Sequence, residues 1–173
     1  MKRAALLSLL PLLAGCGSGI VPADFEPPAR LEHPDFVIRP IRAADAEKDY
    51  EAVMESIDII RAALLGDGWP AETFTLEQNR ADLAKKERLF ARRRSFTYTV
   101  VAPDESRVLG SVYINKGMRG PDAAVFLWVR RSAHEEGLDP VLERAVRGWI
   151  DAEWPFEWVV YPGRGSGIRT EFH

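Results

Sequence analysis

The chain has 173 residues, of which 46% are hydrophobic and 28% are charged, a composition typical of a globular protein with one well-buried domain. Its formal net charge of -3 lacks the positive excess of nucleic-acid-binding proteins, so we expect no nucleic-acid partner. Cys16 is the single cysteine, which excludes an intrachain disulfide.

The first residues have the pattern of an export signal. Lys2 and Arg3 give a basic start, and an apolar run covers residues 4–14. The run is too short for a permanent membrane-spanning helix. The stretch Leu13-Ala14-Gly15-Cys16 resembles the lipobox of bacterial lipoproteins. That resemblance implies that Cys16 is diacylated, becomes the mature N-terminus and holds the protein on a membrane.

The sequence therefore divides into three parts. We expect a signal peptide at residues 1–15, a lipidated tether at 16–34 that is rich in Pro and Gly, and a folded domain at 35–173. The expected location is the bacterial cell envelope, lipid-anchored, and the outer membrane if the host has one, because Gly17 rather than Asp follows the cysteine. A mis-set start codon would instead leave the protein in the cytoplasm.

The first half of the domain predicts a strand and then helices. Pro40 argues that the first strand lies at a sheet edge or ends there. Thr75 and Gln78 have the spacing of a capping box, which starts the third helix. Basic residues gather at 85–94, either on a solvated helix face or as a patch for an anionic ligand or membrane surface. The expected elements are a strand at residues 36–41 and helices at 43–55, 58–65 and 76–92.

The second half predicts a hairpin, a central strand, a helix and a last strand. Gly110 is a candidate bulge in the hairpin. Asp139 suits the N-cap of the helix and Pro140 its first position. Strand, helix and strand in this order imply a right-handed crossover between parallel strands. The expected strands cover residues 95–101, 107–115, 123–130 and 158–161, and apolar positions 138, 141, 142, 145, 146, 149 and 150 share one helix face.

Three stretches in this order resemble the GNAT superfamily of acyl-CoA-dependent N-acyltransferases. They are Phe36–Asp45 (FVIRPIRAAD), Val108–Tyr113 (VLGSVY) and Phe126–Arg130 (FLWVR). The resemblance spans about residues 36–161. It implies an α+β fold with a mixed central β-sheet flanked by helices, and with a C-terminal part shorter than the family's. It also implies acetyl-CoA as co-substrate and an amine as acceptor.

The family's acyl-CoA motif falls on residues 134–139 (HEEGLD). In the family, backbone N–H groups at this helix N-terminus bind the pyrophosphate. Gly137 matches the motif, whereas His134 and Asp139 depart from it, and the neighbouring Glu135 and Glu136 would repel phosphate. The resemblance assigns the pantetheine and phosphate path to five residues: Val129, Arg130, Arg131, Gly137 and Leu138.

The remaining candidate residues lie on the strands. By resemblance, Tyr113, Asn115 and Trp128 would line the substrate cleft, and Tyr161 could act as general acid. The alternative interpretation is that these aromatic side chains only pack in the core or the cleft wall. His134 has no second histidine nearby in the sequence, so we expect no metal site.

Two hypotheses from different classes follow. The first is a GNAT-type acyltransferase that moves an acetyl group from acetyl-CoA to an amine. The second is a non-catalytic, membrane-tethered lipoprotein domain that binds a small molecule or a protein. The acidic motif at residues 134–139 and the lipobox favour the second, and the order of the elements favours the first.

Overall fold

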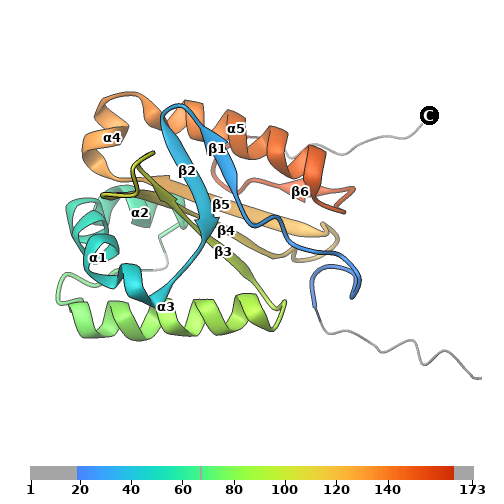
Figure 1. The fold of residues 1–173 in the computed structure, drawn as a ribbon, viewed down its shortest axis with the longest axis horizontal. Coiled ribbons are helices and arrows are strands. Elements are labelled where there is room, and N and C mark those ends of the chain that lie inside the picture. Colours follow the sequence, from blue (N-terminus) through green and yellow to red (C-terminus); the bar gives the residue numbers. More distant parts are fainter. Residues whose placement is uncertain (1–18, 67, 166–173) are drawn as a thin grey trace, which may run out of the picture.

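A six-stranded mixed sheet forms the centre of the computed structural model, which describes residues 19–66 and 68–165 (Figure 1). The strands lie side by side in chain order, and each neighbouring pair is antiparallel except the last, which is parallel. The predicted signal peptide and Cys16 lie outside the described residues. The strands are β1 (Leu31–His33), β2 (Phe36–Pro40), β3 (Phe96–Val101), β4 (Val108–Lys116), β5 (Ala123–Val129) and β6 (Val159–Val160).

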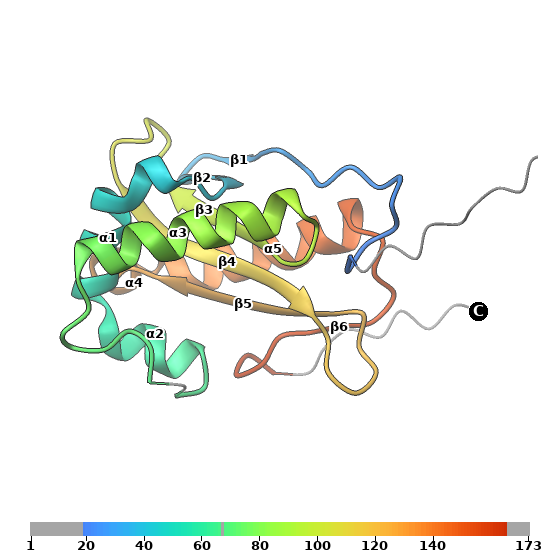
Figure 2. The same ribbon diagram turned by 90° about the horizontal axis from the view of Figure 1, so that it is seen from below.

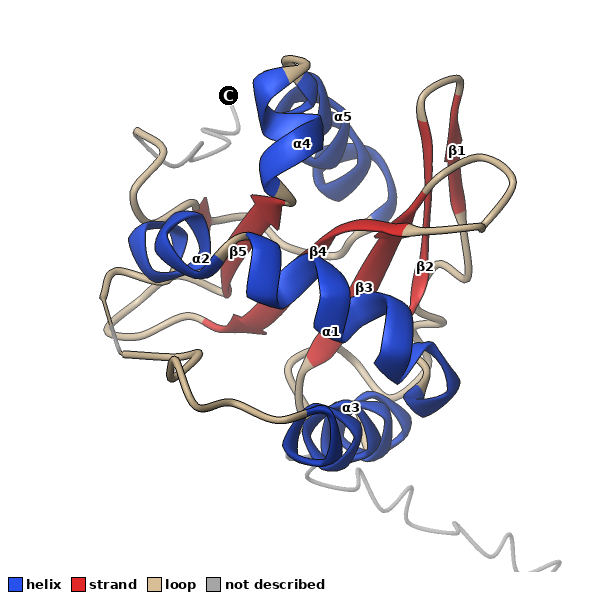
Figure 3. Ribbon diagram, turned by 90° about the vertical axis from the view of Figure 1, so that its left-hand side faces the viewer, coloured by secondary structure: helices blue, strands red, loops and turns tan. Residues whose placement is uncertain are grey.

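Helices cover both faces of this sheet. The first three lie on one face and the last two on the other (Figures 2 and 3). The helices are α1 (Ala46–Glu55), α2 (Ile57–Ala63), α3 (Leu76–Ala91), α4 (Arg131–Glu135) and α5 (Leu138–Glu153), and a 3₁₀ turn at Ala43–Asp45 precedes α1. The GNAT-like α+β architecture expected from the sequence is thus present.

Side chains of β4 and β5 point alternately to the two faces of the sheet and contribute to a hydrophobic cluster on each face. Val112 and Ile114 pack in the cluster that contains α5, whereas Tyr113 and Trp128 pack in the cluster that contains α1 and α2. Successive side chains of a strand point to opposite faces, so one strand serves both layers. The strand residues that the sequence suggested for a substrate cleft therefore lie on the α1–α3 face.

Several local predictions are confirmed. The Thr75 hydroxyl accepts from the Gln78 N–H (3.2 Å), and the Gln78 side chain accepts from the Thr75 N–H (2.9 Å), which completes the capping box. The register between β3 and β4 shifts at Val100/Val101, next to Gly110. Pro40 ends β2, but this strand is not at the sheet edge, because β1 pairs with it.

Part of the expected tether at 16–34 packs on the domain. Val21 is buried in the core, and the ring of Phe25 lies 5.5 Å from that of Trp154. Residues further on form β1, which pairs with β2. The described part of this segment thus belongs to the fold, in contrast to the expected boundary at residue 35. Sequence analysis missed β1 because three residues are too few for a period-2 pattern to show.

A short helix, which the sequence did not predict, leads into the acidic motif. Residues 131–135 form α4, and Gly137 precedes α5 with a left-handed φ of 86°. The N-cap of α5 is therefore Gly137 rather than Asp139, which lies in the first turn of the helix. Glycine reaches this conformation without the penalty that a Cβ would bring.

The last two strands of the sheet, β5 and β6, are paired over only a short stretch and then separate. β6 pairs with β5 only at Ala123↔Val159 and Ala124↔Val160, and β5 continues for five residues beyond the last pair. The chain after β6 turns back at Tyr161, whose carbonyl accepts from the Arg164 N–H. This opening between β5 and the chain after β6 is called the splay below.

Candidate functional site

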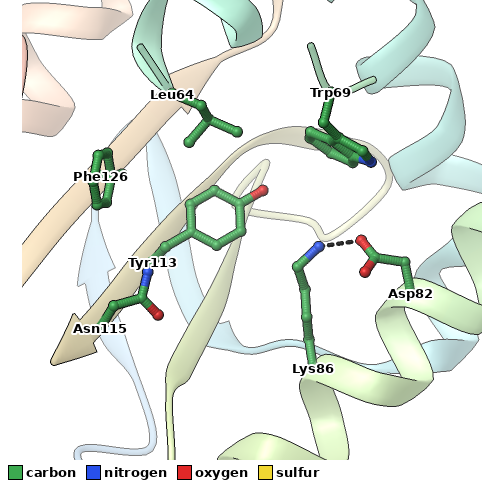
Figure 4. A pocket seen from close by; sticks show the side chains of 7 residues that line it. All are labelled: Leu64, Trp69, Asp82, Lys86, Tyr113, Asn115 and Phe126. Atoms are coloured by element: carbon green, nitrogen blue, oxygen red, sulfur yellow. Dashed lines mark hydrogen bonds and ion pairs between the residues drawn. The ribbon is translucent and has the colours of Figure 1, made fainter. Parts of the chain in front are cut away.

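A pocket of about 460 Å³ opens on the α1–α3 face of the sheet and is called the aromatic pocket (Figure 4). Its walls come from the end of α2, the loop before α3, α3 itself and the strands β4 and β5. The lining residues are Leu64, Trp69, Asp82, Lys86, Tyr113, Asn115 and Phe126. Aromatic and aliphatic walls with a few polar groups are typical of small-molecule sites.

Lys86 places a fixed positive charge in the aromatic pocket. Its ammonium pairs with Asp82, one helical turn earlier on α3, and lies 5.0 Å from the Trp69 ring centre and 5.5 Å from that of Tyr113. Burial alone would lower the pKa of Lys86, but the ion pair with Asp82 and the nearby Asp49 carboxylate act in the opposite direction, and the pKa of Lys86 is raised. The ammonium therefore stays charged at neutral pH.

The three residues expected in a substrate cleft lie together at this pocket. Tyr113 and Asn115 line it, and the Trp128 indole N–H lies underneath and donates to the Tyr113 hydroxyl at 3.1 Å. Burial raises the pKa of Tyr113, so its hydroxyl stays protonated. The Ser95 hydroxyl donates to Asn115 Oδ1 at 2.7 Å, which leaves the Asn115 amide nitrogen on the pocket side of this pair.

Tyr161 lies apart from these residues. It is buried in the core cluster on the α5 face, and the Arg147 guanidinium stacks 3.8 Å from its ring centre. Burial raises the pKa of Tyr161 to about 12. The proposed general acid and the proposed cleft residues are thus on opposite faces of the sheet.

A second pocket, of about 440 Å³, lies at the splay. Arg164 crosses it and donates to both carboxylate oxygens of Asp139 (2.9 and 2.7 Å), to Glu143 (3.0 Å) and to the Leu127 carbonyl (3.2 Å). The titratable lining residues are Asp139, Glu143, Arg164 and His134. Two carboxylates against one guanidinium make this pocket unfavourable for a ligand that carries several phosphate charges.

The arginines expected on the phosphate path are bonded within the chain. The Glu55 carboxylate accepts from the Arg130 guanidinium and, at 2.8 Å, from the Ser132 N–H. Asp58 pairs with Arg131. The Arg130 hydrogen bond is the main reason why the pKa of Glu55 falls to about 2. An internal carboxylate therefore occupies the donors that an incoming phosphate would need.

The other three residues assigned to the acyl-CoA path serve the fold. Val129 is buried in the α5 core, Gly137 caps α5, and Leu138 begins that helix half-buried. Backbone N–H groups at the end of α4 are also engaged, because those of residues 134, 136 and 137 donate to carbonyls within 130–134. Pro140 has no N–H to offer.

The residues that the structure describes contain no group of three or more His, Cys, Asp or Glu placed to hold a metal ion. Within the same residues, no helix is long and apolar enough to cross a membrane.

Comparison with known proteins identifies the fold. No family model matches the sequence, and no curated protein matches it. Several solved structures match this chain. A ribosomal-protein-serine acetyltransferase from Vibrio cholerae has a TM-score of 0.59 at 13% identity, over 75% of this chain and 71% of that chain. A ribosomal-protein-S5-alanine acetyltransferase from Vibrio fischeri has a TM-score of 0.59 at 17% identity, over 76% and 72%. A GNAT-family acetyltransferase from Bacillus anthracis has a TM-score of 0.57 at 15% identity, over 75% and 70%.

The fold is that of the GNAT acetyltransferases. One further structure of this fold, a ribosomal L7/L12 α-N-protein acetyltransferase, is a complex with coenzyme A, at a TM-score of 0.56 and 14% identity over 76% of this chain and 71% of that chain. At such identities the likeness concerns the fold alone, so function depends on this chain's own side chains.

Proposed function

We propose that this protein uses the acetyltransferase fold to bind a small molecule in the aromatic pocket, without acyl transfer from acetyl-CoA. One contrast carries the proposal. The aromatic pocket is open, and Lys86 and Asn115 have N–H groups there that no described residue accepts, whereas Arg130 and Arg131, the arginines expected to bind acetyl-CoA, are paired with Glu55 and Asp58.

Acetyl transfer from acetyl-CoA to an amine is the second candidate. The shared fold favours it. Under this hypothesis the Arg164–Asp139 pair would have to open before the donor could enter, and pocket residues such as Tyr113 would face the acceptor.

Calorimetric titration of the purified protein with acetyl-CoA at physiological salt separates the two candidates. We expect no binding up to millimolar concentration. We also expect none for Asp139→Gly, because the backbone N–H groups around α4 stay engaged. Micromolar binding to the wild type would support the acyltransferase hypothesis. Binding that appears only in Asp139→Gly would show that this carboxylate alone blocks the site.

We also propose that Cys16 is acylated and anchors the protein to the bacterial cell envelope. The sequence Leu13–Cys16 supports this. The first described residues support it as well, because the Ile20 N–H donates to the Arg93 carbonyl at the end of α3, where Arg92 and Arg94 are exposed. Basic residues beside an acyl anchor strengthen attachment to anionic lipid.

Metabolic labelling tests the anchor. Full-length protein expressed in a Gram-negative bacterium should incorporate labelled palmitate and fractionate with membranes, and Cys16→Ser should lose both properties. Label in the Cys16→Ser variant, or wild-type protein without label, would refute the acylation.

A further inference from the structure

Two side chains of the aromatic pocket, Lys86 and Asn115, have hydrogen-bond donors that no described residue accepts. Lys86 carries three N–H groups, and among the described residues its only hydrogen-bond partner is Asp82. The Asn115 Oδ1 accepts from the Ser95 hydroxyl, and the Asn115 amide nitrogen donates to no residue that the structure describes. Two N–H groups of Lys86 and two of Asn115 therefore remain to donate to a ligand, which favours a ligand that is rich in hydrogen-bond acceptors.

The rest of the wall is apolar. Leu64 and Phe126 lie on one side of the opening and Trp69 on the other, with the Tyr113 ring between them (Figure 4). Buried aromatic faces contribute most of the binding energy of small apolar groups. The cavity volume of about 460 Å³ is ample for one aromatic ring with a short polar arm.

The positive charge of Lys86 disfavours an amine as the ligand of the aromatic pocket. Its ammonium already lies at the cation–π position of both Trp69 and Tyr113. A second ammonium in the pocket would meet this charge at short range and in a partly dry environment, where like charges repel strongly. A ligand carboxylate would instead gain charge-assisted hydrogen bonds.

We propose that the aromatic pocket binds a small carboxylate with an apolar body, and that Lys86 and Asn115 hold the carboxylate while Trp69 and Phe126 pack against the body. The proposal rests on the proposed function, that the pocket binds a small molecule, and it names the chemical class of that molecule.

Asp82 competes with such a ligand for Lys86. Its Oδ2 holds the ammonium, and its side chain is 28% exposed, so water can replace the pair at modest cost. Neutral Asp82→Asn would leave Lys86 available and remove the repulsion between the two carboxylates. The variant should therefore bind a carboxylate more tightly than the wild type does, which a merely structural pocket would not do.

Three probes of one shape test the class: phenylacetate, the neutral phenylacetamide and the cationic phenethylamine. Each is titrated into the purified protein, and the indole N–H resonance of Trp69 is followed by NMR. We expect phenylacetate to bind most tightly, with an affinity that falls about tenfold in Lys86→Met and rises severalfold in Asp82→Asn. Lys85→Met, which changes an exposed neighbour on α3, should bind as the wild type does.

Asn115→Ala controls for the case in which Lys86→Met fails to fold. It removes a second donor of the pocket without changing α3, and it should also weaken phenylacetate binding. Tightest binding of phenethylamine, or equal phenylacetate affinity in Lys86→Met and the wild type, would overturn the carboxylate class and leave the pocket as a ligand site. Failure of all three probes to shift the Trp69 resonance would overturn the binding function itself.

Discussion

Asp49→Asn is expected to make the protein more stable above neutral pH, by about 3 kcal/mol, and to leave its stability at about pH 4 unchanged. Asp49 is buried between α1 and α3, and burial raises the pKa of its carboxyl from 3.8 to about 6. A raised folded-state pKa means that the neutral acid is the better-tolerated form. Stability is therefore full below the unfolded-state pKa and falls as pH rises through about 6.

The surroundings of Asp49 explain why asparagine fits. Asn79 Nδ2 donates to the Asp49 carboxylate at 2.9 Å, whereas Asn79 Oδ1 is buried and has no hydrogen-bond partner among the described residues. An amide at position 49 can accept the first bond and donate to that oxygen, as the protonated acid can. A buried acceptor that gains a partner removes a desolvation penalty.

Urea unfolding followed by tryptophan fluorescence, at several pH values from about 4 to about 8, measures this effect. The wild type should lose stability over the range from about 4 to about 6, and Asp49→Asn should not. Asp24→Asn changes an exposed aspartate and is the matched control. Parallel pH profiles for Asp49→Asn and the wild type would mean that ionisation of Asp49 carries no cost.

The fold was largely predictable because its signals are local. Helix α3 is set by the pair Thr75 and Gln78, and β4 and β5 by continuous apolar runs between turns. The one strand that was missed, β1, is held by pairing with β2 rather than by its own sequence. Helix α4 was not predicted, because its five residues are too few for helical periodicity to show.

The candidate site was predictable only in part. Tyr113 and Asn115 came from the family resemblance, but Lys86 lay within a basic run that was assigned to a solvated face or an anionic patch. A signal was present: Lys86 follows Leu83 by three residues and precedes Phe90 by four, so it shares the buried face of α3. The sequence could not reveal that Glu55 neutralises Arg130, because this pair joins residues 75 positions apart.

Glu55→Ala is expected to destabilise the protein by about 2–3 kcal/mol, because it leaves a mostly buried guanidinium and the Ser132 N–H without their acceptor. The Arg130 side chain is only 12% exposed. The stability that the wild-type pair contributes should also depend on pH, since Arg130 lowers the pKa of Glu55 to about 2. That stability is present above the ordinary carboxyl pKa of 4.5 and is lost as pH falls toward 2.

The same variant tests whether the Glu55 carboxylate takes the place of an external anion. Without it, sulfate should bind Arg130 and restore about 1 kcal/mol at a concentration several times its Kd. Sulfate stabilises most proteins in general, so the gain must exceed that of the wild type at equal ionic strength. Asp58→Ala is the matched control, because its exposed pair with Arg131 should contribute less than about 1 kcal/mol.

The outcome for Glu55→Ala distinguishes two states of the acyl-CoA region that the fold alone does not separate: an anion-binding geometry that is blocked, and one that is absent. A specific gain from sulfate, and from coenzyme A over its dephosphorylated form, would mean that the anion-binding geometry survives beneath an internal carboxylate. No gain from either anion would mean that the geometry itself is absent, because the N–H groups around α4 are already bonded to carbonyls. The second result would place any remaining function of this fold in the aromatic pocket.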